Sequence, residues 1–598
     1  MNINNQLGIP NGNIPGLDYT SGIARFNIAG YLQTGSDGFL DSQRIANTFQ
    51  YTSNFTWISG RHTMKFGGDI RRLQSTLTNG QTAPRGQFSF DGNYTSNAGA
   101  VGTGAAFASF LLGDPTAIFR DYINTRPAVR MTFAGLFVQD DIRVSRSLTL
   151  NLGVRWDVFT HPNDVFNRQS NFNIGDGMIH LASDGNSGPD VDIYYKNFAP
   201  RVGFAYTPDN GKTALRGSYG ISYFPDNFGA TGGTLERNYP FFATSQINAA
   251  STFVPNLSVN QGFPGNVTPE IVNNTVSPPA GFAVFRIPQN FRQDTVQMVN
   301  LGLQRQLAGN TVFEIDYVGT RGTHLFRDLD INTPPPGPGD INARRPFVAL
   351  NPNITSIHDR RSDGNSYFNA LEAKLSRRFS NGFQALVSYT YSKTIDTVSN
   401  ILDPYNDTLN RGLSAGFKAV DIPNNFVASY TYELPFGAGK RFLSGASGVK
   451  GKVVTGWSLN GITTARSGEP LVVTVSNSLL NNGSRNYANI VCDHPGTPGN
   501  VGEWFDTGCF TNPPAFTYGN AGIGHVRGPS LVNQDFSIGK STKFNEKRSL
   551  EFRAEFFNIF NSAHLGNPAT TLGNSDFGTI SSTVGTPREV QLGLKLQF

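Results

Sequence analysis

The chain has 598 residues, of which only 15% are charged, whereas an average soluble domain carries roughly 25%. Its formal net charge of +5 is small for this length and comes with no long run of Lys or Arg, so nucleic-acid binding gets no support. No stretch approaches the ~18 uninterrupted apolar residues of a membrane-spanning helix, which argues against a helical membrane protein. The 66 glycines and 47 phenylalanines favour strands joined by tight turns.

The first part of the chain contains two local signals. Its opening residues, MNINNQLGIPNGNIPG, have neither a positively charged segment nor an apolar core, so they are not a signal peptide. Residues 102–115 (GTGAAFASFLLGDP) predict a short helix within a loop, because Gly113 and Pro115 are typical of a helix end.

The main signal is an alternation of apolar and polar residues with a period of two, which is typical of strands with two different faces. In residues 148–156 (LTLNLGVRW), the even-numbered positions are apolar, and the odd-numbered positions are Thr, Asn, Gly and Arg. The pattern recurs at 202–206, 313–317, 371–375, 383–391, 426–434 and 550–556. The last strand, 589–598, has Val590, Leu592, Leu594, Leu596 and Phe598 on its apolar face.

Such strands fit either a sandwich, which buries the apolar face, or a membrane barrel, which turns that face to lipid. Strands of about ten residues match the length needed to cross a bilayer at a tilt, whereas sandwich strands are usually about five or six. Aromatic residues gather towards strand ends, as in the interfacial girdles of barrels. They are Trp156, Phe159, Tyr389, Tyr391, Tyr430, Tyr432, Phe556, Phe557 and Phe560.

The connections alternate in length, which also favours a barrel with short periplasmic turns and long extracellular loops. Short turns are expected near 144–147, 209–211, 308–310 and 380–382. Long connections are expected at 161–197, 225–290, 322–365, 393–422 and 477–529. If the C-terminus lies in the periplasm, all of these long connections fall outside the cell.

Charged residues in the strands are expected to line the lumen, where they pair with each other or meet water. The clearest candidates are Arg155, Glu551, Arg553 and Glu555, and we expect Asp140 and Asp141 to lie there as well. Cys492 and Cys509 stand in one stretch rich in Gly and Pro, and a disulfide that closes this loop fits an oxidising compartment. Two unpaired thiols, or a metal-binding pair without further ligands, are the alternatives.

The sequence contains no arrangement typical of a catalytic or cofactor site. The eight histidines are scattered, and no HExxH or GxSxG motif is present. Residues 445–453 (GASGVKGKV) superficially resemble a phosphate-binding loop, but the glycine spacing is wrong and Val453 replaces the required Ser or Thr, so we expect a glycine-rich turn. We therefore expect no enzyme, no cofactor and no metal.

Several segments resemble the barrel of TonB-dependent receptors, particularly the Oar-like branch that is often fused to a carboxypeptidase-regulatory-like domain. The segments are FVQDDIRVSRSLTLNLGVRWD at 137–157, NFAPRVGFAYTP at 197–208, YTYELPFGAGKRF at 430–442, GWSLNGITTARSGEPL at 456–471 and SLEFRAEFFNIFN at 549–561. The chain end, PREVQLGLKLQF, resembles the terminal strand that the barrel-assembly machinery recognises, with its final Phe598. Together these segments span most of the chain from about residue 50 onward.

The resemblance implies that residues 1–598 form an all-β, antiparallel transmembrane barrel in the outer membrane, with about 16–18 of the family's 22 strands. The plug domain, the TonB box and a signal peptide would precede such a barrel, so we expect the chain to be N-terminally incomplete. The implied partners are outer-membrane lipid, the barrel-assembly machinery, the TonB complex acting through the plug, and an extracellular substrate.

The implied function is energy-coupled passage of a bulky substrate across the outer membrane. Two alternatives stay open. One is a passive outer-membrane channel or an adhesive or structural surface barrel. The other is a secreted array of soluble β-sandwiches, for which membrane fractionation is the discriminating observation.

Overall fold

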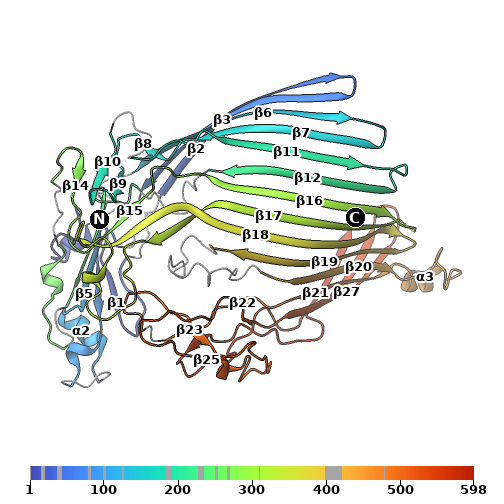
Figure 1. The fold of residues 1–598 in the computed structure, drawn as a ribbon. Coiled ribbons are helices and arrows are strands. Elements are labelled where there is room, and N and C mark those ends of the chain that lie inside the picture. Colours follow the sequence, from blue (N-terminus) through green and yellow to red (C-terminus); the bar gives the residue numbers. More distant parts are fainter. Residues whose placement is uncertain are drawn as a thin grey trace.

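The computed structural model describes residues 2–14, 20–36, 43–78, 83–97, 103–123, 127–183, 190–225, 235–249, 253–264, 270–308, 310–397, 421–476 and 479–598. One large sheet dominates these residues (Figure 1). Of its 17 strands, β8 (Asn163–Asp164) and β15 (Phe282–Arg286) are short additions beside β6 and β18. The other fifteen form an antiparallel meander, so the prediction of an all-β architecture is confirmed.

The fifteen meander strands follow one another in chain order. They are β2 (Gln43–Ser59), β3 (His62–Thr78), β6 (Ala128–Arg143), β7 (Leu148–Phe159), β11 (Asn197–Tyr206), β12 (Thr213–Phe224), β16 (Asp294–Gln306), β17 (Thr311–Asp330), β18 (Ile354–Ser380), β19 (Phe383–Asp396), β20 (Asn424–Glu433), β21 (Trp457–Arg466), β27 (Leu531–Lys543), β28 (Ser549–Phe557) and β30 (Glu589–Gln597). Each is hydrogen-bonded to the next, from Gln43 opposite Thr78 to Phe557 opposite Glu589.

Short and long connections lie at opposite ends of the sheet, as the sequence predicts. At one end, which we call the turn end, asparagine and glycine supply the positive φ of tight hairpins, as in Asn210 (51°) with Gly211 (85°) and Asn381 (51°) with Gly382 (76°). The last strand, β30, also ends there (Figure 1). The other long connections, so far as the structure describes them, lie at the other end, which we call the loop end (Figure 1). One turn-end connection is longer and contains helix α3 (Gly448–Val454), so the glycine-rich turn expected there is wrong.

The long connections carry structure of their own, which the alternation in the meander strands does not predict. One four-stranded sheet consists of β1 (Arg25–Ile28), β4 (Gln87–Phe90), β5 (Ala117–Ile123) and β13 (Phe242–Asn248). The expected helix at 102–115 is confirmed as α2 (Ala106–Leu112), and Gly113 ends it with a φ of 77°. Phe26, Phe88 and Phe90 form the core between this sheet and α2.

Further small elements complete the loop end. They are α1 (Ile3–Gln6), β9 (Ser170–Asn173), β10 (Met178–Leu181), β14 (Thr275–Val276), β22 (Pro470–Leu471), β23 (Thr474–Val475), β24 (Asn489–Ile490), β25 (Phe510–Thr511), β26 (Val526–Arg527) and β29 (Thr571–Leu572), with the 3₁₀ turns η2 (Asn93–Thr95), η3 (Val259–Gln261), η4 (Asn342–Arg344) and η6 (Thr507–Cys509). Among the described residues, no helix has the length and apolar character needed to cross a membrane.

The register keeps the two faces of the sheet chemically distinct. On β28 and β30, Leu550, Phe552 and Ala554 stand opposite Leu596, Leu594 and Leu592, whereas Glu551 stands opposite Lys595. Directly opposed residues in an antiparallel pair project to the same side, so apolar residues align with apolar ones and polar with polar. The register connects these two faces from strand to strand across the meander, with exceptions near strand ends.

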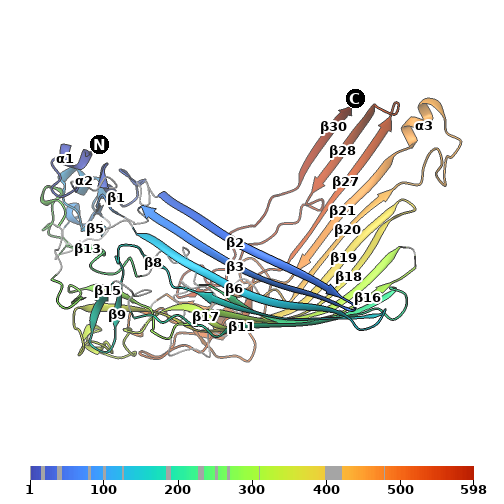
Figure 2. The same ribbon diagram turned by 90° about the horizontal axis from the view of Figure 1, so that it is seen from above.

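The meander curves into a trough with β2 along one rim and β30 along the other (Figure 2). β2 and β30 do not pair with each other in the described part of the chain. β2 and β30 both run from the loop end to the turn end. The chain direction reverses at each step of an antiparallel meander, and an even number of reversals lies between these two strands. If β2 and β30 paired directly, they would be parallel. The fifteen strands therefore form an arc of a barrel, and an odd number of further strands would be needed to close it with antiparallel pairs only.

Two expected connections differ from the structure. The loop expected at 322–365 is shorter, because β17 and β18 continue as a hairpin beyond their neighbours, with Asp328 opposite Arg360. Ion pairing supports this extension, since Arg360 Nε lies 3.3 Å from Asp328 Oδ2. Most of the connection expected at 393–422 falls outside the described residues.

Candidate functional site

On the polar face, charged side chains form ion pairs with neighbours of opposite charge on the same or a nearby strand. Arg155 Nε lies 2.7 Å from Asp157 Oδ1, and Arg155 Nη2 lies 4.0 Å from Asp69 Oδ2, which also pairs with Arg71 at 2.6 Å. A Cβ at residue 135 would lie 2.2 Å from Arg155 Nη2, so Gly135 leaves the space that this guanidinium occupies. Charges of both signs therefore compensate one another on this part of the face.

The same face continues to the other rim. Arg553 Nη1 lies 3.7 Å from Glu555 Oε1, and Glu551 stands opposite Lys595. Followed strand by strand, the register puts Arg155, Glu551, Arg553 and Glu555 on one face. Asp141 is there too and accepts hydrogen bonds from Asn151 Nδ2 (2.6 Å) and Gln139 Nε2 (3.1 Å).

Asp140 is an exception, and its expected place in the lumen is wrong. It stands opposite Met64 and Leu152 on the apolar face, next to the turn end. Its Oδ2 lies 2.6 Å from His62 Nδ1, which gives the carboxylate a partner at the edge of the apolar surface. The alternation of Leu136, Val138 and Asp140 could have revealed this placement.

Two of the expected girdle aromatics also lie on the polar face. Phe159 is buried and packs edge-to-face on Phe133, with ring centroids 5.2 Å apart. Phe557 stands opposite Glu589. At these two strand ends an aromatic residue takes a position on the polar face. A place near a strand end therefore does not by itself show that an aromatic side chain lies at the membrane interface.

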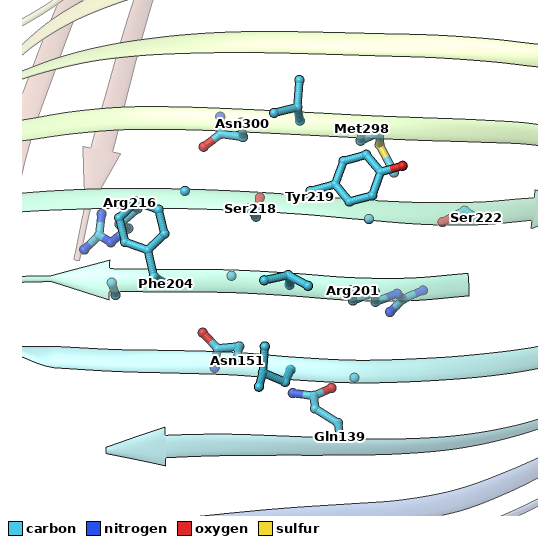
Figure 3. A pocket seen from close by; sticks show the side chains of 18 of the residues that line it. Gln139, Asn151, Arg201, Phe204, Arg216, Ser218, Tyr219, Ser222, Met298 and Asn300 are labelled. Carbon is cyan, nitrogen blue, oxygen red and sulfur yellow. The ribbon is translucent and has the colours of Figure 1, made fainter. Parts of the chain in front are cut away.

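A hollow of about 760 Å³ opens on the polar face where β6, β7, β11, β12 and β16 lie side by side (Figure 3). Gly153 and Gly220 both stand opposite Arg201, and Gly203 follows Arg201 two residues later on the same face, so three positions around Arg201 carry no side chain. Its polar lining includes Gln139, Asn151, Arg201, Arg216, Ser218, Ser222 and Asn300. We call this cavity the glycine hollow.

The glycine hollow has a positive lining. Arg216 Nη1 donates a hydrogen bond of 2.9 Å to Gln304 Oε1, a neutral acceptor. Within the described residues, neither Arg201 nor Arg216 has a carboxylate within ion-pair distance. The hollow can therefore contact polar or anionic groups of a solute. Sequence patterning missed it, because the three glycines come from three strands, although Arg201, Gly203 and Ala205 alternate on one face of β11.

The terminal strand β30 lies at the rim of the trough. Its apolar row of Val590, Leu592, Leu594, Leu596 and Phe598 is strongly exposed. One edge of β30 pairs with β28, and its other edge has no partner strand in the described part of the chain.

The loop between β21 and β27 has its own core around a disulfide between Cys492 and Cys509. Phe505 and Phe510 pack edge-to-face against each other with centroids 5.6 Å apart, and Phe577 from the next loop packs on both rings. Two consecutive loops are thus joined into one cluster at the loop end.

Buried carboxylates fix other loops. Burial alone would raise the pKa of Asp164, but hydrogen bonds from Arg168 and from the backbone N–H groups of Ala128 and Phe166 outweigh it and hold this pKa below its usual value. Asp421 behaves alike, because the Thr394 amide, Arg527 and Lys393 overcome the burial that would raise its pKa. Every partner of Asp164 and of Asp421 donates a hydrogen bond to the ionised carboxylate. This arrangement stabilises the charge and does not resemble two carboxyl groups that act as acid and base. Throughout the described ranges, no group of three His, Cys, Asp or Glu side chains is arranged to hold a metal ion.

Comparisons with known proteins agree with this architecture. A family model described as "Outer membrane beta barrel domain" matches residues 1–591. The outer membrane transporter YddB from Escherichia coli is similar in fold, with a TM-score of 0.51 at 11% identity, over 93% of this chain and 55% of YddB. The siderophore receptor PirA from Acinetobacter baumannii has a TM-score of 0.44 at 11% identity, over 95% of this chain and 55% of its own.

The ferric-catecholate import receptor Fiu from Escherichia coli K12 has a TM-score of 0.41 at 12% identity, over 95% of this chain and 56% of its own. The chain thus spans about half the length of these structures. None of the curated proteins matches it. Because the family model covers nearly the whole chain, the protein belongs to the outer membrane β-barrel domain family and is a protein of the cell outer membrane.

Proposed function

We propose that this chain is the barrel part of a TonB-dependent, energy-coupled transporter that passes a bulky substrate across the outer membrane. The observation that carries the proposal is the separation of the two faces. An apolar face suited to lipid surrounds a polar, charge-paired face that contains the glycine hollow. A structural or adhesive barrel needs the first face but does not need a hollow on the second.

The loop end supplies a surface for substrate capture in this proposal. Outer-membrane barrels direct their long loops outward. Here those loops have buried aromatic cores of their own, and one loop cluster is closed by a disulfide. Ordered loops can hold a binding surface in a fixed shape at a lower entropic cost than disordered ones.

Energy coupling is the part of the proposal that the described residues support least directly. It requires a plug that fills the polar side of the arc and is pulled by the TonB complex, as in the receptors that the sequence resembles. The fold likeness to the transporter YddB supports the barrel part alone. In the same proposal, the exposed row of β30 with Phe598 is the segment that the barrel-assembly machinery recognises.

The test compares depletion of solutes from the medium by cells that produce the full-length protein, with and without a protonophore. We expect depletion of a bulky solute that needs both the protein and the proton-motive force. Depletion that persists with the protonophore would indicate a passive channel instead, and no protein-dependent depletion would indicate a structural or adhesive role.

A matched pair of variants links the result to the glycine hollow. A Cβ at residue 203 makes only ordinary contacts, so Gly203→Trp can place an indole in the hollow without a backbone clash. The neighbouring Val202 is exposed on the apolar face, so Val202→Trp adds the same ring on the other side of the sheet. We expect Gly203→Trp to slow passage and Val202→Trp to leave it unchanged.

A further inference from the structure

A second cavity lies at the loop end, away from the glycine hollow. It has a volume of about 450 Å³ and lies between the segment joining β15 to β16, the extended part of β17 and the facing part of β18. Its charged lining consists of Arg286, Arg292, His324, Asp359, Arg361 and Asp363. The pairing of β16 with β17 begins at Thr295 opposite Thr323, so this cavity lies beyond the loop-end terminus of β16. We call it the rim pocket.

Arginines outnumber carboxylates in the rim pocket. The Asp359 side chain is inaccessible and accepts from Arg286 Nη1 at 2.7 Å and from Arg361 Nε at 2.9 Å. Asp363 pairs with the buried Arg327 at 2.5 Å, and Arg361 lies 3.8 Å from it. Asp359 and Asp363 are thus shared among the guanidinium groups of Arg286, Arg327 and Arg361. Arg292 is a fourth arginine near them.

Arg292 adds a further positive charge to the lining of the pocket. Its guanidinium lies over the ring of Tyr194, 5.1 Å from the centroid, and no carboxylate of the described residues is within ion-pair distance. Its backbone N–H donates a 3.0 Å hydrogen bond to Ser362 Oγ, which fixes the segment against β18. The stacking orients the cation and leaves its N–H groups available for a ligand.

His324 has an unusual backbone and an unused nitrogen. It lies in the irregular pairing between Gly322 and Leu325 and has a φ of 56°, a conformation that costs energy for a residue with a Cβ. Its Nδ1 is buried with no hydrogen-bond partner in the described part of the chain. Burial and the nearby charge of Arg292 lower the pKa of this histidine, so its ring is neutral at pH 7.

We propose that the rim pocket binds an oxyanion group, a carboxylate or a phosphate, of a ligand that arrives from the loop end. The excess of guanidinium groups excludes a metal cation and favours an anion. The planar fork of an arginine matches two oxygens of a carboxylate or phosphate. The group can come from a free solute or from a phosphate-bearing lipid of the outer leaflet.

The experiment titrates the purified full-length protein with two probes, inorganic phosphate and lipopolysaccharide, and compares three proteins. These are the unaltered protein, Arg292→Gln and Arg441→Gln. Arg441 is a matched control, because it also lies over an aromatic ring, that of Phe442 at 5.4 Å, and is exposed, but it lies at the turn end. A fourth protein, His324→Asn, keeps a residue that tolerates positive φ and removes the imidazole.

We expect saturable binding of at least one probe, about tenfold weaker in Arg292→Gln and unchanged in Arg441→Gln. His324→Asn should weaken the same binding. Binding of phosphate identifies a free anion as the source, whereas binding of lipopolysaccharide alone identifies a lipid-borne phosphate. Absence of saturable binding of both probes, or equal affinities in Arg292→Gln and the unaltered protein, would overturn the proposal.

Discussion

Leu301 and Asn300 are neighbours near the middle of β16 whose side chains project to opposite faces of the sheet. Leu301 stands opposite Gly217 and Tyr317 on the apolar face and is half exposed, whereas Asn300 stands opposite Ser218 and lines the glycine hollow. If the apolar face meets hydrocarbon, a charge at 301 must enter lipid, while a charge at 300 stays in water. A pair of arginine substitutions therefore measures which face meets the membrane.

We expect Leu301→Arg to destabilise the protein in a bilayer by about 2–4 kcal/mol, the cost of Arg at the midplane of an outer-membrane barrel. A value of about 3 kcal/mol corresponds to roughly two powers of ten in the folding equilibrium. Asn300→Arg meets the positive lining formed by Arg201 and Arg216 but stays hydrated, so we expect a change below about 1 kcal/mol.

The measurement is the denaturant midpoint for unfolding of the full-length protein in phospholipid vesicles, followed by tryptophan fluorescence. A larger loss for Asn300→Arg than for Leu301→Arg would mean that the polar face meets lipid or a packed core, and the assignment of the two faces would fail.

Three further predictions concern the loop end and the terminal strand. Replacing Cys492 by Ser should remove about 3 kcal/mol of local stability, because the disulfide closes a loop of 17 residues; limited proteolysis within 467–530 measures this, and unchanged cleavage would contradict it. The stabilisation from the low pKa of Asp164 should persist above about pH 4 and disappear as pH falls through that lowered value, seen as lower protection of the amides at 163–169 relative to their intrinsic exchange rates at each pH. Deleting Phe598 should reduce assembly into the outer membrane, and an unchanged amount of folded barrel would count against the role of that strand.

Strand geometry explains how much could be read directly from the residues. A strand alternates its side chains at every step, so the alternation at 148–156 and 589–598 already separates the apolar row from the polar row. A second local rule, the readiness of Asn and Gly to adopt a positive φ, explains the tight turns at Asn210 and Asn381 and the helix end at Gly113. Alternation also put Arg155 on the polar row of its own strand and Glu551, Arg553 and Glu555 on the polar row of theirs.

Contacts between distant segments could not be read in this way, because alternation identifies faces but not partners. The glycine hollow needs Gly153, Gly203 and Gly220 around Arg201 on one face, and only the pairing of β7, β11 and β12 brings them there. Asp359 meets Arg286 across 73 residues of chain in the rim pocket.

From its sequence alone, this protein is a set of two-faced strands joined by alternating short and long connections, since those properties depend on neighbouring residues. The tertiary structure decided the curvature of the sheet, the parallel direction of its two rim strands and the positions of both cavities. The physical reason is that each of these depends on which backbone hydrogen bonds form between segments far apart in the chain, and residue type restricts that choice only weakly.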